Sequence, residues 1–223
     1  SGIEWTTRGE PAGRTYNGNH WELVFRSRPE SWDLEAVYLA DRMGHPVDEK
    51  PHVFIATPAY QNPELPYLDS VARVVEDLRA HGIGATHFLT GGDSLVTRGR
   101  HILAHTFLCS DATHFLQWDA DIECRDVTAV RKMVESGRPI VGGAYPFRDG
   151  SGSVVANLLA EDRKAQKVDI RPDQTIPVSE VGTGFLMVRR HGLIDLQQKH
   201  PELLYEADME GVRGMPMWAL FDV

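Results

Sequence analysis

The chain has 223 residues, 42% hydrophobic and 25% charged, a composition that is typical of a globular protein and excludes disordered, collagen-like and disulfide-scaffold proteins. This length supports one large domain, alone or with an appendage, whose core needs neither a metal nor cross-links. The formal net charge of −9 argues against a general polyanion binder, whose affinity would come from neutralising phosphates.

Cysteine usage and hydropathy narrow the class of protein further. Cys109 and Cys124 are too few for a secreted disulfide framework or a structural zinc site, which takes about four ligands. The N-terminus has no apolar segment of the signal-peptide kind, and no window approaches the ~20 apolar residues that span a bilayer. We expect a soluble, cytoplasmic protein with no membrane span.

Residues 1–50 differ in composition from the rest of the chain. A polar, turn-rich stretch comes first, and one predicted helix follows, capped by Ser31 and ended by Gly44 and Pro46. We expect 1–50 to be an N-terminal extension packed on a core domain that covers 51–223.

Strands and helices alternate from residue 51 to about residue 143. The predicted strands are 53–56, 85–90, 113–118 and 138–143, and the predicted helices are 67–81, 94–110 and 126–136. This alternation predicts an α/β fold with a mostly parallel sheet covered by helices on both faces. Ligands of such folds bind beyond the carboxyl ends of the strands.

The second half, 151–223, has a different pattern. Strands are predicted over 154–159 and over 178–189, the latter interrupted at Gly182-Thr183-Gly184, and a short helix over 191–200 ends at Pro201. These elements predict a mixed sheet.

The segment Asp119-Ala120-Asp121 directly follows the apolar strand 113–118. Residues i and i+2 of an extended segment face the same side, about 6.6 Å apart, so both carboxylates can flank one divalent cation. Hard oxygen ligands suit Mg²⁺ or Mn²⁺. The alternative is a solvated acidic turn at the end of a strand.

A second polar segment begins the helix after the second strand. Asp93 or Ser94 is expected to cap this helix, and Arg98 and Arg100 lie in its first turns, where a guanidinium can hold a diphosphate. Residues i and i+2 of a helix do not share a face, so one arginine is expected to be functional and the other structural.

Glycines end two further strands, in Val141-Gly142-Gly143-Ala144-Tyr145-Pro146 and in Val181-Gly182-Thr183-Gly184-Phe185. Such glycines let backbone amides approach a sugar or phosphate, or simply make a tight turn. Neither segment is a dinucleotide-binding fingerprint or a P-loop.

Taken in order, five segments resemble a glycosyltransferase with the GT-A fold, closest to the family-2-like and Anp1-like proteins of bacteriophages and bacteria. They are 55–60, 94–100, 113–122, 142–146 and 181–190. The resemblance implies a metal-dependent transfer of a sugar from a nucleotide-diphosphate sugar, UDP- or GDP-linked, to an acceptor hydroxyl in the cytoplasm of a bacterial or phage-infected cell. It also implies a nucleotide-binding half, 51–150, and an acceptor-side half, 151–223.

The resemblance assigns roles by position. Thr57, Pro58 and Tyr60 would border the base, Asp93 the base or ribose, and Arg98 and Arg100 the diphosphate. Asp119 and Asp121 would bind Mn²⁺ or Mg²⁺, and the donor-sugar and acceptor pocket would be lined by Gly143, Tyr145, Gly182, Thr183 and Gly184. Family members continue into an acidic segment that supplies the catalytic base, so this chain is either truncated or built differently. Asp208 and Asp222 are the candidate carboxylates.

Other functions stay open. A non-catalytic GT-A domain that binds a nucleotide sugar or a partner is the main alternative, followed by a sugar nucleotidyltransferase and a phosphatase of the haloacid-dehalogenase type. The resemblance leaves the acceptor unknown, with a hydroxymethylated DNA base, a polysaccharide and a small molecule as the candidates. A DNA acceptor would suit a basic face made by Arg26, Arg28, Arg131, Lys132, Arg189 and Arg190.

Overall fold

The computed structural model describes residues 50–60, 62–92, 94–146, 154–158, 175–208 and 212–221, and four two-residue strands nearer the N-terminus. The chain divides into two compact units. The smaller unit comprises Ser1–Val47 and Tyr205–Pro216, and the larger unit comprises Asp48–Leu204 and Met217–Val223. Of the predicted functional residues that are described, all lie in the larger unit except Asp208 and Arg26 of the predicted basic face.

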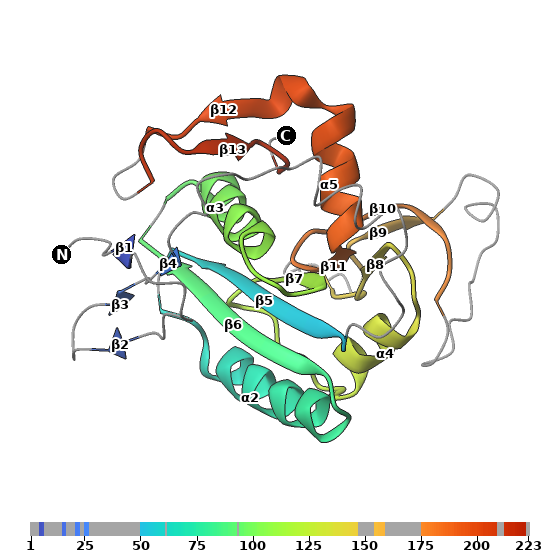
Figure 1. Ribbon diagram of the computed structural model, residues 1–223. Coiled ribbons are helices and arrows are strands. Elements are labelled where there is room, and N and C mark those ends of the chain that lie inside the picture. Colours follow the sequence, from blue (N-terminus) through green and yellow to red (C-terminus); the bar gives the residue numbers. More distant parts are fainter. Residues whose placement is uncertain are drawn as a thin grey trace. The chain divides into compact units, whose positions relative to one another are not determined.

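A five-stranded sheet forms the centre of the larger unit, in the order β6-β5-β7-β11-β8 (Figure 1). Its strands are β5 (His52–Ala59), β6 (Gly84–Gly91), β7 (His114–Trp118), β8 (Ile140–Gly142) and β11 (Phe185–Arg189). β5 is parallel to β6 and β7, whereas β11 is antiparallel to both β7 and β8. Four strands therefore run in one direction, which confirms the mostly parallel sheet and the mixed character of its second half.

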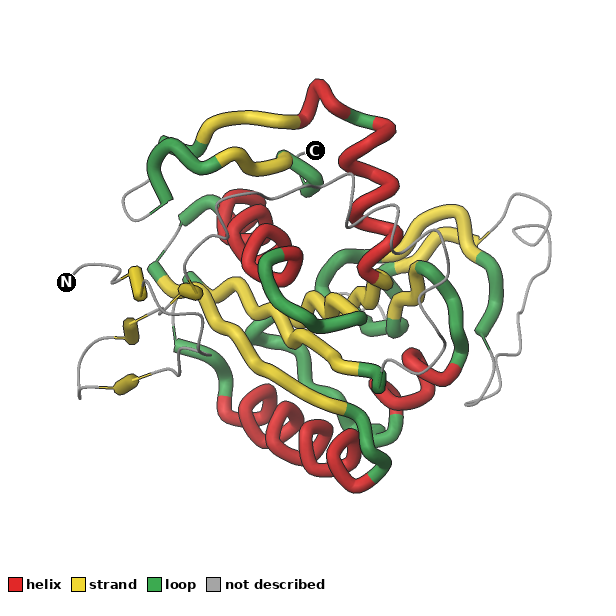
Figure 2. Tube along the Cα trace, viewed as in Figure 1, coloured by secondary structure: helices red, strands yellow, loops and turns green. Residues whose placement is uncertain are grey.

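Helices cover both faces of this sheet (Figures 1 and 2). α2 (Leu65–Ala80) and α4 (Ala129–Glu135) pack against each other on one face. α3 (Val96–Leu108) lies on the other face, against β5, β6 and β7. α5 (Arg190–Lys199) directly follows β11, where the sequence predicts a helix. The α/β class with helices on both faces is thus confirmed.

The alternation of side chains along β5 explains why both faces are covered. Every residue of β5 after His52 is buried. Val53 and Ile55 join the apolar cluster that includes Val74 of α2. Phe54 points the opposite way, with its ring centroid 5.8 Å from that of Phe107 on α3. A strand that is buried on both faces needs a nearly continuous apolar run, as the sequence has here.

Helix α2 ends where the sequence predicts. Gly82 has a φ of 73°, and its N–H donates to the carbonyl of Arg79 at 3.1 Å. The N–H of Ile83 then donates to the carbonyl of Leu78 at 2.9 Å. A glycine in the left-handed conformation after the last turn closes a helix because it has no Cβ to clash.

The start of α3 differs from the prediction. The helix begins at Val96, and the residue at its N-cap is Leu95, which makes no capping side-chain hydrogen bond. The prediction that Ser94 caps this helix is therefore wrong, and Asp93 lies outside the described residues. The extended backbone of Leu95, with φ −97° and ψ 100°, makes the helix start two residues later than the cap pattern indicates.

Strand β5 is longer than the predicted 53–56, because Thr57 and Pro58 belong to it. Pro58 pairs with Thr90 of β6, but β7 pairs with β5 only as far as Ala56. Proline lacks the N–H that a strand with two neighbours needs, so it is tolerated here, where β5 has a neighbour on one side only.

The remaining elements are small. In the larger unit, β9 (Ala156–Leu158) pairs antiparallel with β10 (Val178–Val181), and a 3-10 helix (Pro201–Leu203) follows α5. β12 (Leu204–Glu206) and β13 (Pro216–Trp218) form a two-stranded sheet. The N-terminal strand pairs are β1 (Trp5–Thr6) with β4 (Phe25–Arg26), and β2 (Thr15–Tyr16) with β3 (Trp21–Glu22). The helix predicted after Ser31 lies outside the described residues. Across the described residues, no helix is long and apolar enough to cross a membrane.

Candidate functional site

The predicted site residues gather at the carboxyl edge of β5, β6 and β7. The chain leaves β5 for β6 on one side and later returns to β7 on the other side of β5. The carboxyl ends of such strands border a crevice in open α/β sheets, and ligands bind there. Tyr60 follows β5 at this edge, and Asp119 follows β7.

An ion pair between Arg100 and Asp119 forms the polar centre of this edge. One nitrogen of Arg100, Nη2, lies 3.2 Å from Oδ1 and 3.1 Å from Oδ2 of Asp119. The exposed fractions of the two side chains are 13% and 27%, so solvent screens the pair less than it would on the open surface. Two of the predicted motifs, 19 residues apart, thus meet as the sequence indicates.

The residues after β7 form a turn and not the extended segment that the sequence suggests. The N–H of Ile122 donates to the carbonyl of Asp119 at 3.2 Å, which closes a turn over Ala120 and Asp121. Two further contacts hold this turn: the indole N–H of Trp118 donates to the Ile122 carbonyl at 2.8 Å, and the Glu64 N–H donates to the Ala120 carbonyl at 3.1 Å. The i, i+2 alignment expected for Asp119 and Asp121 is therefore wrong, and Asp121 is exposed at the corner of the turn.

Tyr145 and Gly184 join the ion pair through a hydrogen-bond chain. The N–H of Asp119 donates to the carbonyl of Gly184 at 2.8 Å, and the N–H of Gly184 donates to the hydroxyl of Tyr145 at 3.0 Å. Three predicted motifs, after β7, after β8 and before β11, are connected in this way.

The glycines of these motifs make room for neighbouring side chains. A Cβ on Gly182 would lie 2.3 Å from the hydroxyl oxygen of Tyr145, and a Cβ on Gly143 would lie 2.3 Å from the ring of Phe185. A Cβ on Gly184 would lie 2.7 Å from the same hydroxyl oxygen and 3.0 Å from Oδ2 of Asp119. The space beside each glycine is therefore filled by the protein itself. Thr183, between the two glycines, is half-buried in the turn that joins β10 to β11.

We expect Gly184→Ala to destabilise the protein by about 1–3 kcal/mol, because the added methyl group must displace Tyr145 and Asp119 in a packed site. Gly91→Ala is the matched control at the end of β6, where the atom nearest to an added Cβ lies 3.9 Å away. Urea unfolding of both variants measures the difference. Equal losses of stability in the two variants would contradict the close packing around Gly184.

A pocket lies between the end of β5 and the start of α3. It is lined by Pro58, Ala59, Tyr60, Thr90, Ser94, Leu95, Val96 and Gly99. Tyr60 is 65% exposed and Leu95 is 55% exposed, whereas Pro58 is buried. A Cβ on Gly99 would make ordinary van der Waals contacts, 3.4 Å from the Thr90 hydroxyl oxygen and 3.7 Å from Cβ of Pro58, so this turn of α3 faces the ends of β5 and β6. The pocket is thus shared by Pro58 and Tyr60, at the end of β5, and by residues of the motif 94–100, which contains Arg100.

The hydroxyl of Thr57 points into the protein. Thr57 is completely buried and hydrogen-bonds to the hydroxyl of Tyr67, which lies 2.9 Å from Nε2 of His87. Burial raises the pKa of Tyr67 above its ordinary value, and the hydrogen bond to Thr57 acts in the opposite direction. The side chain of Thr57 is therefore engaged beneath the edge of the sheet. Sequence analysis missed Tyr67 and His87, because Tyr67 fits the apolar face of α2 and His87 lies inside a strand.

The two predicted aspartates, Asp119 and Asp121, are the candidate metal ligands. Among the described residues, no group of three or more His, Cys, Asp or Glu side chains is placed to hold a metal. Mg²⁺ and Mn²⁺ do not need such a cage, since they commonly bind one or two carboxylates together with substrate phosphates and water. Asp119 fits that coordination mode, with Arg100 as the competitor for its carboxylate. Asp121, exposed in the same turn, stays the second candidate ligand.

Several predicted residues are placed elsewhere. Arg98 is half-buried in the first turn of α3. Asp208 lies in the smaller unit and is exposed, and its carbonyl accepts a hydrogen bond from Arg213. Asp93 and Asp222 lie outside the described residues. The structure thus brings together Arg100, Asp119, Tyr145 and Gly184, and leaves the catalytic carboxylate a prediction.

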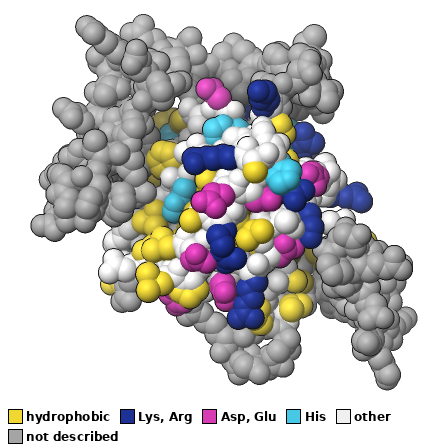
Figure 3. Space-filling view, turned by 90° about the horizontal axis from the view of Figure 1, so that it is seen from below, with side chains coloured by type: hydrophobic (Ala, Val, Ile, Leu, Met, Phe, Trp, Pro, Cys, Tyr) yellow, Lys and Arg dark blue, Asp and Glu magenta, His cyan; other side chains and the backbone are white. Residues whose placement is uncertain are grey.

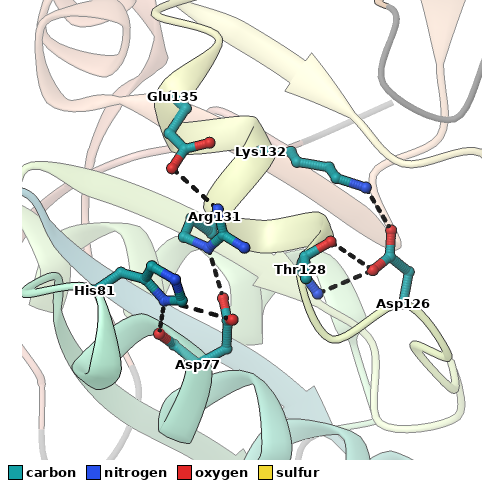
Figure 4. Close-up of polar contacts among 7 residues, drawn as sticks. All are labelled: Asp77, His81, Asp126, Thr128, Arg131, Lys132 and Glu135. Atoms are coloured by element: carbon teal, nitrogen blue, oxygen red, sulfur yellow. Dashed lines mark hydrogen bonds and ion pairs between the residues drawn. The ribbon is translucent and has the colours of Figure 1, made fainter.

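Two members of the predicted basic face are paired with acidic groups (Figure 4). Arg131 lies 3.0 Å from Asp77 and 3.2 Å from Glu135, and Lys132 lies 3.0 Å from Asp126. Figure 3 shows basic and acidic side chains interspersed over this face of the molecule. Arg131 and Lys132 therefore do not supply the free positive charge that recognition of a nucleic acid backbone needs.

Comparison of the sequence with known proteins found no relative. No protein-family model matches the chain, and no curated protein matches it. The resemblance to GT-A glycosyltransferases therefore depends on the five motifs, and the interpretation of the site depends on its own geometry and chemistry.

Proposed function

We propose that the protein is a metal-dependent glycosyltransferase with a GT-A fold, which moves a sugar from a nucleotide-diphosphate sugar to an acceptor hydroxyl. The observation that carries this proposal is the meeting of Arg100 and Asp119 at the carboxyl edge of the sheet. A neighbouring guanidinium and carboxylate can together bind a complex of a divalent cation with a diphosphate. The guanidinium binds the negative phosphate oxygens, and the carboxylate binds the positive cation.

The surroundings of the ion pair support the same proposal. The pocket at Pro58 and Tyr60 offers an apolar surface on which a nucleobase can stack. Tyr145 is connected to Asp119 through Gly184 on the other side of the ion pair. Because the space beside the glycines is filled, the side chain of Tyr145 is the candidate contact for the sugar of the donor. The mixed sheet of mostly parallel strands is compatible with the proposed fold.

Each residue then has a defined task in the transfer. Arg100 would bind the diphosphate and stabilise the negative charge that develops on it as the bond to the sugar breaks. A Mn²⁺ or Mg²⁺ ion bound by Asp119 and Asp121 would supply Lewis-acid stabilisation to the same leaving group. An inverting transfer also needs a carboxylate within hydrogen-bond reach of the acceptor hydroxyl, a role for which Asp208 and Asp222 stay the candidates.

The first test is a thermal-shift screen of UDP-, GDP-, ADP- and dTDP-sugars with and without Mn²⁺. At a concentration of about 100 times its Kd, the correct donor should raise the melting temperature of a chain of this size by about 5–10 °C, and only with Mn²⁺ present. We expect Asp119→Asn and Asp121→Ala to abolish the Mn²⁺-dependent shift, because each removes a carboxylate from the proposed cation site.

Glu123→Gln is the matched control, since Glu123 is a nearby exposed carboxylate paired with Arg125 at 3.1 Å. Its shift should equal that of the unmodified chain. If no nucleotide sugar raises the melting temperature, the proposal fails. A shift without any hydrolysis or transfer of the donor would instead identify a non-catalytic domain that binds nucleotide sugars.

A further inference from the structure

Gln117 is a buried polar residue to which the predicted motifs assign no function. Only 1% of its surface is exposed, and neither Oε1 nor Nε2 of its side chain has a hydrogen-bond partner among the described residues. Buried amides are nearly always hydrogen-bonded, because burial without a partner costs free energy. The amide of Gln117 therefore has donor and acceptor capacity that none of the described residues uses.

Gln117 lies on the same face of the sheet as the ion pair of Arg100 and Asp119. Side chains alternate along β7: Phe115 packs against Phe107 of α3, and Asp119 contacts Arg100 of α3. Gln117 lies between Phe115 and Asp119 in this alternation, so its amide also points to the α3 side of the sheet. Nε of Arg100, on the helix that covers this face of the sheet, is likewise buried and has no partner among the described residues.

The ion pair itself is incomplete. Both oxygens of Asp119 accept from the same nitrogen, Nη2 of Arg100, whereas a bidentate pair would use two nitrogens of the guanidinium. Arg100 thus covers the carboxylate oxygens that a cation would need, while its Nε is left unpaired. A guanidinium that uses one nitrogen in its ion pair keeps other N–H groups for a second acceptor, whereas a bidentate ion pair uses two nitrogens.

We propose that Arg100 is an exchangeable counter-ion of Asp119. When a diphosphate binds, the guanidinium turns from Asp119 to the phosphate oxygens, its Nε donates to Oε1 of Gln117, and Asp119 becomes free for the divalent cation. The cation and the diphosphate therefore bind together, and the cation alone binds weakly because Arg100 competes for its ligand. This inference rests on the proposed function, which supplies the diphosphate and the cation.

The test measures binding of Mn²⁺ alone, with no nucleotide, from the loss of the electron paramagnetic resonance signal of free Mn²⁺. Arg100→Gln and Arg100→Met should each bind Mn²⁺ at least tenfold more tightly than the unmodified chain. The double variant Arg100→Gln with Asp119→Asn should lose this gain. Melting temperatures of the variants establish that each is folded, and the second substitution at Arg100 serves if the first does not fold.

The outcomes separate this inference from the proposed function. If the unmodified chain binds Mn²⁺ alone as tightly as both Arg100 variants, or if the gain persists without the Asp119 carboxylate, the exchange does not occur. Neither measurement involves a nucleotide. The competition of Arg100 with the cation for Asp119 can therefore hold when the nucleotide-sugar screen fails, and it can fail when the screen succeeds. Gln117→Met tests the role of Gln117 in the exchange. It should raise the melting temperature of the ligand-free chain and weaken Mn²⁺-dependent binding of UDP and GDP, and an unchanged affinity for both would remove Gln117 from the exchange.

Discussion

Arg190→Ala is expected to lower the free energy of unfolding by about 3–5 kcal/mol. The substitution removes a half-buried guanidinium, and several carbonyl groups then lose their hydrogen-bond donor. Arg190 donates to the carbonyl of Ala112 at 2.9 Å and to that of Leu108 at 3.2 Å, and also to those of Phe107 and Ser110. Its guanidinium carbon lies 4.6 Å from the centre of the Phe107 ring. Sequence analysis assigns Arg190 to a basic face, whereas the structure uses it to close the carboxyl end of α3.

The physical basis is the helix terminus. The last carbonyls of a helix have no hydrogen-bond donor inside the helix, and they carry the partial negative charge of the helix dipole. A guanidinium at this end donates hydrogen bonds to these carbonyls and also neutralises the partial charge. Arg190→Lys keeps the charge but not the planar fork, and we expect it to recover part of the loss. Guanidinium chloride unfolding gives the values, with the exposed Arg138→Ala as the control that should change stability little. A loss below 1 kcal/mol for Arg190→Ala would contradict this role.

The second large effect is a loss of stability in acid. Burial lowers the pKa of His114 to about 4, and the positive charges of Arg189 and His191 act in the same direction. The unfolded chain therefore binds a proton near pH 6.5 that the folded chain takes up only near pH 4. Stability is unaffected by His114 above pH 6.5 and falls as the pH drops through this window. At 1.36 kcal/mol per pKa unit, the loss reaches about 3 kcal/mol.

Unfolding free energies measured from pH 7 to pH 4 test this prediction. His114→Gln should remove most of the acid-dependent loss, because glutamine does not titrate. His52, whose pKa is also lowered by burial, should leave a residual slope. His200→Gln is the control, since His200 is exposed beside Glu202. An unchanged pH profile in His114→Gln would show that His114 is not the group responsible.

Much of the fold could be predicted because its signals are local. The helical spacing of apolar residues predicts α2, and Gly82 marks its end, because one glycine in the left-handed region is sufficient to stop a helix. The meeting of Arg100 and Asp119 also follows from the sequence, because both motifs come after parallel strands and the ends of such strands share one edge.

Other parts of the site depend on groups that are distant in the sequence. The insertion of β11 between β7 and β8 brings Gly184 beside Asp119, and Tyr145 then fills the space that Gly182 and Gly184 leave open. In the sequence these glycines resemble a ligand cradle, and only their neighbours show what occupies the space. The turn at Asp119 is likewise held by Trp118 and by the distant Glu64, so the segment itself suggests an extended backbone.

The sequence by itself determined the elements of this protein, their α/β class and the charged residues that reach the edge of the sheet, because periodicity, turn residues and strand ends act within a few residues. Only the tertiary structure decided the contacts of those charges. Arg100 covers Asp119, Gln117 is buried and has no hydrogen-bond partner among the described residues, and Arg190 closes the carboxyl end of α3. Hydrogen-bond partners and burial depend on packing between distant segments, and no local pattern encodes them.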